Sequence, residues 1–371
     1  LSTIPNAGSW IDYEFPFRSG IIAGGEGWQF GLGRDRVRVG PGLSGQLVLG
    51  SHLPFVDHAR LSLWNEVLQF QSWVVGLEPW LTAEEVARDG EPEERAKNLL
   101  LHRFEYAPTD WLLIGLTEGL MFSGQRLDVA RLNPAAILHN FYIWEYAASL
   151  SALDLSLALA PGLVLYASAA MNQLQSPFEI RTYGADGIPN ALAALGGLQA
   201  ARPLGDRLAL RLDLEYAWLN PWMYIRETQL RSFTWRHRYT SNYLRGRPLE
   251  TLPLGHRWGP DSRGIVGRLA LESRAWSAGF LGIAAQVEIS EHGEQTVLSP
   301  YDEGEDATSL QTPSGNAETR QLAALMVDWE IPLGPFRLVV DAEYRALLTS
   351  NPESPASDTN QGLYAALRVV L

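Results

Sequence analysis

The stretch RLALRLDLEY, residues Arg207–Tyr216, decides the fold class, because its side chains alternate in character along the chain. Leucines occupy four alternate positions, and charged side chains occupy most of the positions between them. Successive side chains of a β-strand point to opposite faces of its sheet. The alternation therefore predicts a strand with one apolar and one charged face, rather than a helix with its period of about 3.6 residues.

The same alternation recurs along most of the chain, for example at 265–275, 281–289, 336–348 and 363–371. Strands of soluble sandwiches average about 5–6 residues, whereas a tilted transmembrane strand needs about 9–11. A sheet that spans a bilayer must pair every backbone N–H and C=O group, which only a closed barrel achieves. The pattern therefore predicts an all-β fold, namely a closed antiparallel transmembrane β-barrel with short helices in its loops.

The longest segment without a charged residue, Leu155–Phe178, is long enough to span a bilayer as a helix. Pro161 and Gly162 interrupt it, and its leucines follow the strand period of two, so we expect strands here as well. Tryptophans near the ends of the expected strands are typical of the aromatic girdles at bilayer interfaces. They are Trp28, Trp64, Trp111, Trp218, Trp222, Trp276 and Trp329.

Short and long connections mostly alternate, as periplasmic turns and extracellular loops do in outer-membrane barrels. Tight-turn signals occur at 108–110, 161–162, 203–206 and 332–335. Long polar connections are expected at 78–98, 122–150, 174–190, 241–262, 292–318 and 349–360. We expect about 18 strands, with 16 as the alternative count. Their ranges are 10–18, 27–38, 44–50, 58–65, 68–77, 99–107, 110–121, 151–160, 163–173, 191–201, 207–218, 221–228, 231–240, 263–274, 278–291, 319–331, 336–348 and 361–371.

Two signals predict short helices inside these connections. Asn133 followed by Pro134 resembles a helix N-cap with proline at the first helical position. Thr82 and Glu85 have the spacing of a capping box. No linker or low-complexity tract divides the chain, so residues 1–371 are expected to form a single domain.

The composition excludes several classes of protein. The formal net charge of −13 argues against nucleic-acid binding, which needs a net basic face. The chain has no cysteine, which excludes disulfides, thiolate metal sites and cysteine nucleophiles. It begins at Leu1 without the pattern of a signal peptide. We therefore expect a chain whose signal peptide has been removed and which lies in the outer membrane, in contact with its lipid.

Blocks of sequence in a fixed order resemble the capsule assembly Wzi family of outer-membrane proteins. The longest block is GLGRDRVRVGPGLSGQLVLGSHLPFVDHARLSL, residues Gly31–Leu63, with a Gly-Arg strand, a Val-Gly-Pro-Gly turn and a proline-bounded loop. Similar blocks follow at 102–122, 131–142, 162–173 and 252–264. The resemblance implies a barrel of about 18 strands that acts as a surface lectin and attaches capsular polysaccharide.

No motif in the sequence predicts catalysis, a cofactor or a metal site. The seven histidines form neither a HExxH motif nor a pair at metal-binding spacing with a third ligand. The sequence contains no Gly-x-Ser-x-Gly motif, although a hydrolase whose triad is assembled across strands stays an alternative. The acidic run 302–306 is interpreted as a solvated loop, with calcium binding as the alternative. We therefore expect that the protein is not an enzyme.

A segment rich in arginine and aromatic residues, 231–258, is the candidate site for an acidic glycan. Arginine matches carboxylates in geometry, and flat aromatic faces suit the apolar face of a sugar ring. The alternative interpretation is an arginine ladder paired across the lumen, with interface aromatics beside it. The candidate glycan-binding residues are Trp235, Arg236, Arg238, Tyr243, Arg245, Arg247, Arg257 and Trp258.

The charged face of the expected strands is predicted to line the lumen, and the apolar face is predicted to contact lipid. The lumen-lining candidates are Arg211, Asp213, Glu215, Arg268, Glu272, Arg274, Asp341, Glu343, Arg345 and Arg368. The lipid-facing candidates are Leu208, Leu210, Leu212, Leu269, Leu338, Val340 and Leu367. A shift of register by one residue would exchange the two sets.

Three functions remain open at this point. The family resemblance favours binding of surface or capsular polysaccharide, and the architecture alone is equally typical of a porin or substrate channel. A structural role with other envelope proteins as partners is the third. Planar-bilayer conductance separates the first two, because an open lumen carries a steady current.

Overall fold

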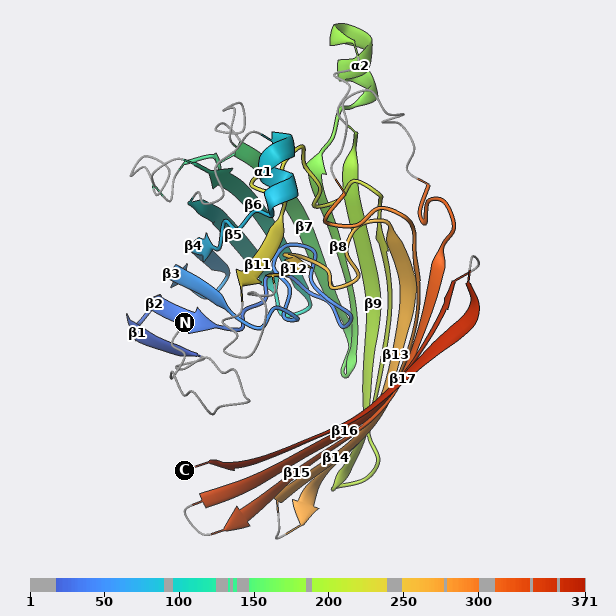
Figure 1. The fold of residues 1–371 in the computed structure, drawn as a ribbon. Helices are drawn as coiled ribbons and strands as arrows, with labels where there is room; N and C mark the ends of the chain where they lie inside the picture. Colours follow the sequence, from blue (N-terminus) through green and yellow to red (C-terminus); the bar gives the residue numbers. More distant parts are fainter. Residues whose placement is uncertain are drawn as a thin grey trace, which may run out of the picture.

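The computed structural model describes residues 18–89, 96–124, 133, 136–138, 147–184, 189–238, 249–276, 279–299, 311–333, 336–351 and 354–370. These residues form a 15-stranded antiparallel sheet, in which neighbouring strands follow chain order, and a 2-stranded sheet of β11 and β12. In Figure 1 the large sheet curves around the small one. The expected all-β, antiparallel fold is therefore confirmed.

The large sheet contains β1 (Ser19–Gly25), β2 (Trp28–Asp35), β3 (Val56–Trp64), β4 (Leu68–Leu77), β5 (Lys97–Thr109), β6 (Leu112–Ser123), β7 (Ala147–Ala160), β8 (Leu163–Gln173), β9 (Ala191–Pro203), β10 (Leu208–Leu219), β13 (Ser262–Trp276), β14 (Gly279–His292), β15 (Glu318–Leu333), β16 (Phe336–Asn351) and β17 (Ser354–Val370). The small sheet pairs β11 (Thr234–Arg238) with β12 (Leu249–Pro253). Two helices complete the described elements, α1 (Ala83–Asp89) and α2 (Pro177–Tyr183).

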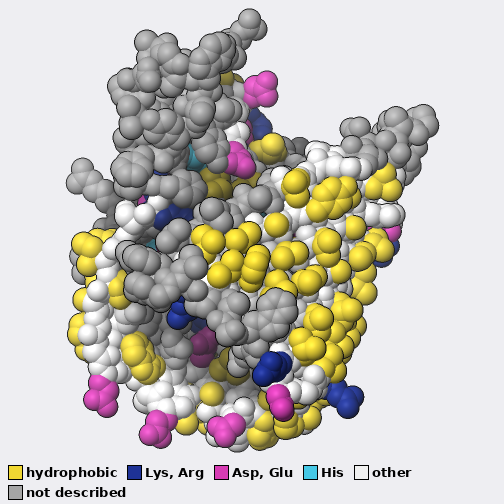
Figure 2. Space-filling view, turned by 90° about the horizontal axis from the view of Figure 1, so that it is seen from below, with side chains coloured by type: hydrophobic (Ala, Val, Ile, Leu, Met, Phe, Trp, Pro, Cys, Tyr) yellow, Lys and Arg dark blue, Asp and Glu magenta, His cyan; other side chains and the backbone are white. Residues whose placement is uncertain are grey.

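The two faces of the sheet differ in character along each strand. In β10, Leu214 and Tyr216 are 39% and 50% exposed, whereas Asp213 and Glu215 are 0% and 2% exposed. The register extends this division to the next strand, because Asp213 pairs with Arg268. In Figure 2 apolar side chains cover much of the outer wall, and charged ones lie within the hollow and at the rim. The sheet thus has an apolar outer face and a polar inner face.

This division predicts how a misplaced charge behaves in a membrane. Leu269 is 48% exposed on the outer face of β13, and Leu204 is 46% exposed in the short turn between β9 and β10. Leu269→Arg is expected to lower the free energy of unfolding in lipid vesicles by about 2–4 kcal/mol, because its charge enters hydrocarbon. Leu204→Arg lies at the interface and should cost about 0–1 kcal/mol. Urea titrations in vesicles compare the two, and equal losses would contradict the assignment of the outer face.

Short turns join β1 to β2, β3 to β4, β5 to β6, β7 to β8 and β9 to β10 at one end of the sheet. Trp28, Trp64 and Trp111 lie beside three of these turns and are 44%, 41% and 53% exposed, as the expected girdle requires. The prediction for Trp222 was wrong, because this side chain is buried against Ala191 in the interior. Its segment leaves the wall after β10.

The described sheet ends at β1 on one side and at β17 on the other, and no ladder joins these two strands within the described residues. The expected strand 10–18 lies almost entirely outside the described residues. Closure of the barrel and the count of about 18 strands therefore stay predictions. A further expectation was wrong at the last connection, because β17 begins at Ser354 where a long loop over 349–360 was predicted.

The predicted strands at 44–50 and 221–228 are absent, and the one at 231–240 forms β11 away from the wall. Residues 39–55, 220–238 and 249–261 instead fold on the concave side of the sheet (Figure 1), and we call them the plug. The physical reason is that Leu47, Val48 and Leu49 are all apolar and at most 2% exposed. A segment that buries consecutive side chains needs neighbours on every side, which a strand in the wall does not have.

The capping box predicted at α1 is confirmed. The backbone N–H of Thr82 donates to the Glu85 carboxylate at 2.8 Å, and the N–H of Glu85 donates to Thr82 Oγ1 at 3.2 Å. The helix α2 lies where a loop was expected, and most of the helix predicted after Asn133 lies outside the described residues. None of the described helices is long and apolar enough to cross a membrane.

Candidate functional site: the plugged interior

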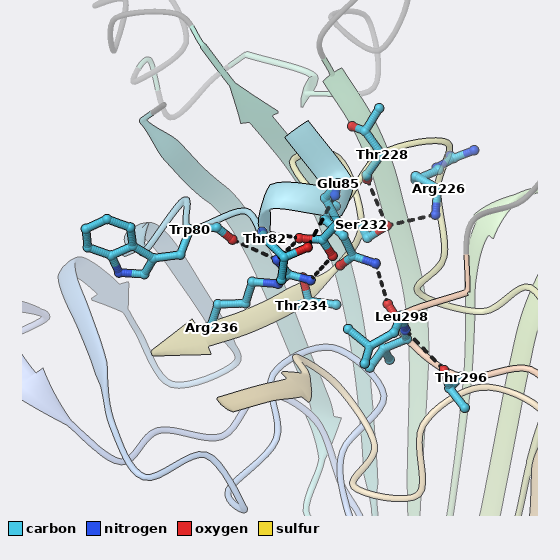
Figure 3. A network of polar contacts seen from close by, with 12 residues as sticks. Trp80, Thr82, Glu85, Arg226, Thr228, Ser232, Thr234, Arg236, Thr296 and Leu298 are labelled. Atoms are coloured by element: carbon cyan, nitrogen blue, oxygen red, sulfur yellow. Dashed lines mark hydrogen bonds and ion pairs between the residues drawn. The ribbon is translucent and has the colours of Figure 1, made fainter. Parts of the chain in front are cut away.

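An ion pair attaches β11 of the plug to helix α1, as Figure 3 shows. Arg236 is 2% exposed, and its two terminal nitrogens donate to both oxygens of Glu85 at 2.7 and 2.6 Å and to the carbonyl of Trp80 at 2.7 Å. Burial by itself would raise the pKa of Glu85, but the contacts with Arg236 and Thr82 hold it below its usual value. Glu85 is therefore ionised at neutral pH.

The single lysine of the chain forms a second attachment between the plug and the wall. Lys97 begins β5 and is 3% exposed. Its ammonium group donates to the carbonyls of Gln229, Ser232 and Thr234 at 2.9, 2.8 and 3.2 Å, and to Thr234 Oγ1 at 3.0 Å. An ammonium has three protons, so this environment satisfies all its donors and fixes the chain that leads into β11.

Glu215 of β10 forms the third attachment, at the loop that begins the plug. Its carboxylate accepts the backbone N–H groups of Leu43 and Ser44 at 2.6 and 2.7 Å, the hydroxyl of Tyr166 at 2.7 Å, and the Ser44 hydroxyl. The carboxylate is 2% exposed, and four donors compensate its loss of water. This arrangement seats the Gly-Pro-Gly turn against the wall.

The three segments of the plug, 39–55, 220–238 and 249–261, meet at Tyr224. Its hydroxyl donates to the Leu47 carbonyl at 2.8 Å and accepts the backbone N–H of His256 at 3.0 Å. A Cβ on Gly255 would lie 2.1 Å from this hydroxyl and 2.5 Å from the Leu47 carbonyl, so only glycine allows this approach. Tyr224 is completely buried, and burial raises the pKa of its phenol, so the hydroxyl keeps its proton.

Ser44, His256 and Glu215 are adjacent but do not form a catalytic triad. His256 Nδ1 accepts the N–H of Trp258 at 3.3 Å, so its Nε2 carries the proton and donates to Ser44 Oγ at 2.8 Å. The Ser44 hydroxyl therefore donates to Glu215, and His256, whose Nε2 already carries a proton, cannot act as the general base of a Ser-His-acid triad. Burial, with Arg257 nearby, lowers the pKa of His256, which keeps the ring neutral. The arrangement joins the plug to the wall and is inaccessible to a substrate.

Below the plug, on the side of the short turns, the wall carries a second buried ion pair. Arg103 donates to Asp154 and, at 2.8 Å, to Thr117 Oγ1, while Ser168 donates to Asp154 at 2.5 Å. A cavity of about 290 Å³ adjoins this pair and is lined in part by Arg38. The interior thus contains charged groups that are compensated within the wall.

The lumen-lining candidates can be placed from exposure and register. Arg211, Asp213, Glu215, Arg268, Glu272, Asp341, Glu343 and Arg345 lie on the inner face, and the register places Arg368 on the same face. The lipid-facing candidates Leu208, Leu210, Leu212, Leu269, Leu338, Val340 and Leu367 lie on the opposite face. The side chains of Arg274, Arg368 and Leu367 are outside the described residues.

The structure does not bring the described candidate glycan-binding residues, Trp235, Arg236, Arg257 and Trp258, together on a surface. Trp235, Arg236 and Trp258 are 3%, 2% and 9% exposed, and Arg236 is occupied by Glu85. Arg257 is paired with Glu288, which also accepts the indole N–H of Trp258. Trp235, Arg236 and Trp258 are therefore corrected to plug residues, because their buried side chains cannot contact a glycan. Arg257 is a partly exposed plug residue whose guanidinium is paired. Four side chains lie outside the described residues, namely those of Arg238, Tyr243, Arg245 and Arg247.

Some interior residues were missed by the sequence interpretation. The sequence did not indicate that Glu85, Lys97 and Tyr166 contact the plug, because their plug partners are distant in the sequence. The arginines at 34, 36 and 38 could have been found from the sequence, because the run RDRVR places three guanidinium groups within five residues. Within the described residues, no cluster of three or more His, Cys, Asp or Glu side chains could hold a metal ion, and the acidic run 302–306 lies outside them.

Comparison with known proteins bears on the fold. No family model and no curated protein sequence matches the chain. Among solved structures, the chain is similar to Wzi, an outer membrane protein involved in group 1 capsule assembly in Escherichia coli and described as a carbohydrate binding β-barrel. The TM-score is 0.56 at 15% identity, and the match covers 94% of this chain and 76% of Wzi. The described antiparallel sheet is therefore similar in fold to this outer-membrane β-barrel.

Two further solved structures match less well. The RagAB peptide importer gives a TM-score of 0.39 at 8% identity, covering 87% of this chain and 37% of the importer. A Pseudomonas aeruginosa FadL homologue gives 0.29 at 14% identity, covering 80% of this chain and 70% of the homologue. Of these three structures, Wzi has the TM-score that bears on the fold, and at that level it agrees with the resemblance found in the sequence blocks.

Proposed function

We propose that this protein closes into an outer-membrane barrel whose plug blocks diffusion and whose long connections retain an acidic polysaccharide at the cell surface. The observation that carries the proposal is the plug. Its core side chains are buried, and Arg236, Lys97 and Glu215 attach it to the surrounding structure. A lumen filled in this way does not suit a diffusion porin, which needs an open, water-filled channel.

The fold supports the same proposal in a second way. The solved structure with a similar fold, Wzi, is described as carbohydrate binding. In this chain the long connections lie at the end of the sheet opposite the short turns, which are periplasmic in barrels of this type. We place the polysaccharide at that end, in contact with the connection that contains Tyr243, Arg245 and Arg247. Envelope proteins are proposed as further partners, and catalysis is not part of the proposal.

The experiment that tests this function measures polysaccharide retention on cells. Arg245→Ala combined with Arg247→Ala should reduce retention severalfold at low salt and less at high salt, because exposed charges are screened over about 8 Å at physiological ionic strength. Tyr243→Ala should reduce retention at all salt concentrations, since stacking on a sugar ring is not screened. The matched control is Arg202→Ala with Arg207→Ala, two exposed arginines at the opposite end. Unchanged retention in folded Arg245/Arg247 and Tyr243 variants would exclude this connection as the binding site.

A further inference from the structure

An arginine-lined pocket lies on the inner face of β1–β4, where β2 leads into the plug. Its volume is about 550 Å³, which is within the range of small-ligand sites. The residues Gly20, Gly33 and His58 place it at the strand ends remote from the short turns. It therefore lies on the side of the long connections. Among the described residues, the pocket is lined by Arg18, Arg34, Arg36, Arg38 and Arg60, and by one carboxylate, that of Asp35.

Two of these arginines are compensated by neighbouring acids. Arg34 donates to both oxygens of Asp57 at 2.7 Å, and Arg18 lies 3.9 Å from Asp35. The Asp35 carboxylate also accepts the backbone N–H of Arg36 at 2.7 Å. At this edge of the pocket, the positive and negative charges are therefore close to balanced.

The other three arginines carry charge that the described residues do not compensate. Arg36 and Arg38 are exposed, and neither guanidinium has an ion pair or hydrogen bond within the described part of the chain. Arg60 lies 4.9 Å from the centroid of the Trp73 ring and donates to Gln29 at 3.0 Å. Its Nε is buried and has no partner in the described structure. The pocket thus presents positioned donors and an excess of positive charge.

The floor of the pocket leaves room for a ligand. A Cβ on Gly31, which is buried, would meet only one atom of the described residues within 4 Å, Cγ1 of Ile22 at 3.9 Å, so a small group has room beside this glycine. Guanidinium groups bind carboxylates through paired hydrogen bonds, and three of them around an open space suit an oxyanion on a chain. A charge-assisted hydrogen bond is strengthened inside a partly enclosed site, where screening by water is reduced.

We propose that this pocket binds the carboxylate of an acidic sugar within a polysaccharide chain, with Arg36, Arg38 and Arg60 as its ligands. The proposal rests on the proposed function and names the class of sugar that the protein retains. We take the bound carboxylate to belong to the polysaccharide, because the pocket lies beside the plug at the end of the sheet that carries the long connections.

Calorimetry of the purified full-length protein in detergent tests this site, with oligogalacturonate as the acidic probe and a maltooligosaccharide as the neutral one. Wild-type protein should bind only the acidic probe. Arg36→Gln with Arg38→Gln should weaken binding about tenfold or more, because two charge-assisted contacts are lost. Gly31→Leu should abolish binding while all arginines remain, because its side chain fills the pocket.

Two control variants match these changes. Arg202→Gln with Arg207→Gln removes the same charge from exposed positions at the short-turn end, and Gly196→Leu makes the same substitution on the outer face, opposite Tyr216. Both should bind the probe like wild type. Because the arginine pair is exposed and unpaired in the described structure, its loss should leave the unfolding midpoint unchanged, which keeps the test independent of folding.

Three results would overturn the proposal. They are undiminished binding by folded Gly31→Leu, equal weakening by the two arginine pairs, and binding of inorganic phosphate in place of oligogalacturonate. The proposed function fails separately. If cells retain polysaccharide and the Arg245/Arg247 variant loses it while purified protein ignores the acidic probe, the pocket is excluded and the surface role stands.

Discussion

Arg236→Leu is expected to release the plug from α1 and to lower its free energy of attachment by about 3–5 kcal/mol. The substitution leaves Glu85 charged, buried and without the two hydrogen bonds that compensate it, and such an uncompensated charge is costly. Limited proteolysis of the plug and planar-bilayer conductance measure the release. Arg263→Leu is the matched control, since its pair with Glu291 is exposed and worth about 0–1 kcal/mol.

A double variant distinguishes the effect of losing the ion pair from the effect of losing packing. Glu85→Leu combined with Arg236→Leu should recover part of the loss, because no uncompensated charge remains. The pair also predicts a response to acid. The folded pKa of Glu85 lies below its ordinary value of 4.5, so its stabilisation is present above that value and is lost as the pH falls through the folded pKa. If the double variant and the single variant release the plug equally, the ion pair is not the attachment.

Glu215→Leu is expected to destabilise the interior by about 3 kcal/mol or more. The change leaves the buried donors of Leu43, Ser44 and Tyr166 without an acceptor, and each unsatisfied donor costs about 1–3 kcal/mol. Glu215→Gln should lower the stability less, because the amide oxygen of glutamine still accepts hydrogen bonds from some of these donors. Urea titration in detergent measures the losses, and hydrogen exchange at residues 43–44 should rise.

Glu272→Leu is the matched control for this experiment. Glu272 also lies on the inner face and is partly buried, and no hydrogen bond to its side chain occurs in the described structure. Its substitution should change the free energy of unfolding by less than about 0.5 kcal/mol. An equal loss in the two variants would mean that inner-face charge, and not the seat of the Gly-Pro-Gly turn, accounts for the stability.

The strands of the large sheet could be predicted, because the alternation of side chains within each strand is enough to identify it. In β4 and β8 the predicted ranges coincide with the observed strands, Leu68–Leu77 and Leu163–Gln173. Alternation assigns each side chain to a face without reference to any other segment. The capping box of Thr82 and Glu85 was predictable for the same reason, since both partners lie within one helical turn.

The plug could not be predicted in the same way. Its apolar segment around Leu47–Leu49 has the composition of a buried strand, and only its neighbours distinguish a plug from a wall. Those neighbours are remote, since Ser44 and Glu215 are 171 residues apart, and Arg236 and Glu85 are 151 apart. Arginines interleaved with aromatics favoured a glycan surface at 231–258, but two of these arginines, Arg236 and Arg257, pair with Glu85 and Glu288, which are distant in the sequence.

Planar-bilayer conductance of the purified protein tests whether the plug fills the interior of the curved sheet. We expect no steady open-channel current from the wild-type protein. Arg236→Leu, with its plug released from α1, should produce a steady current under the same conditions. A steady wild-type current as large as that of the variant would contradict this expectation and favour a diffusion porin.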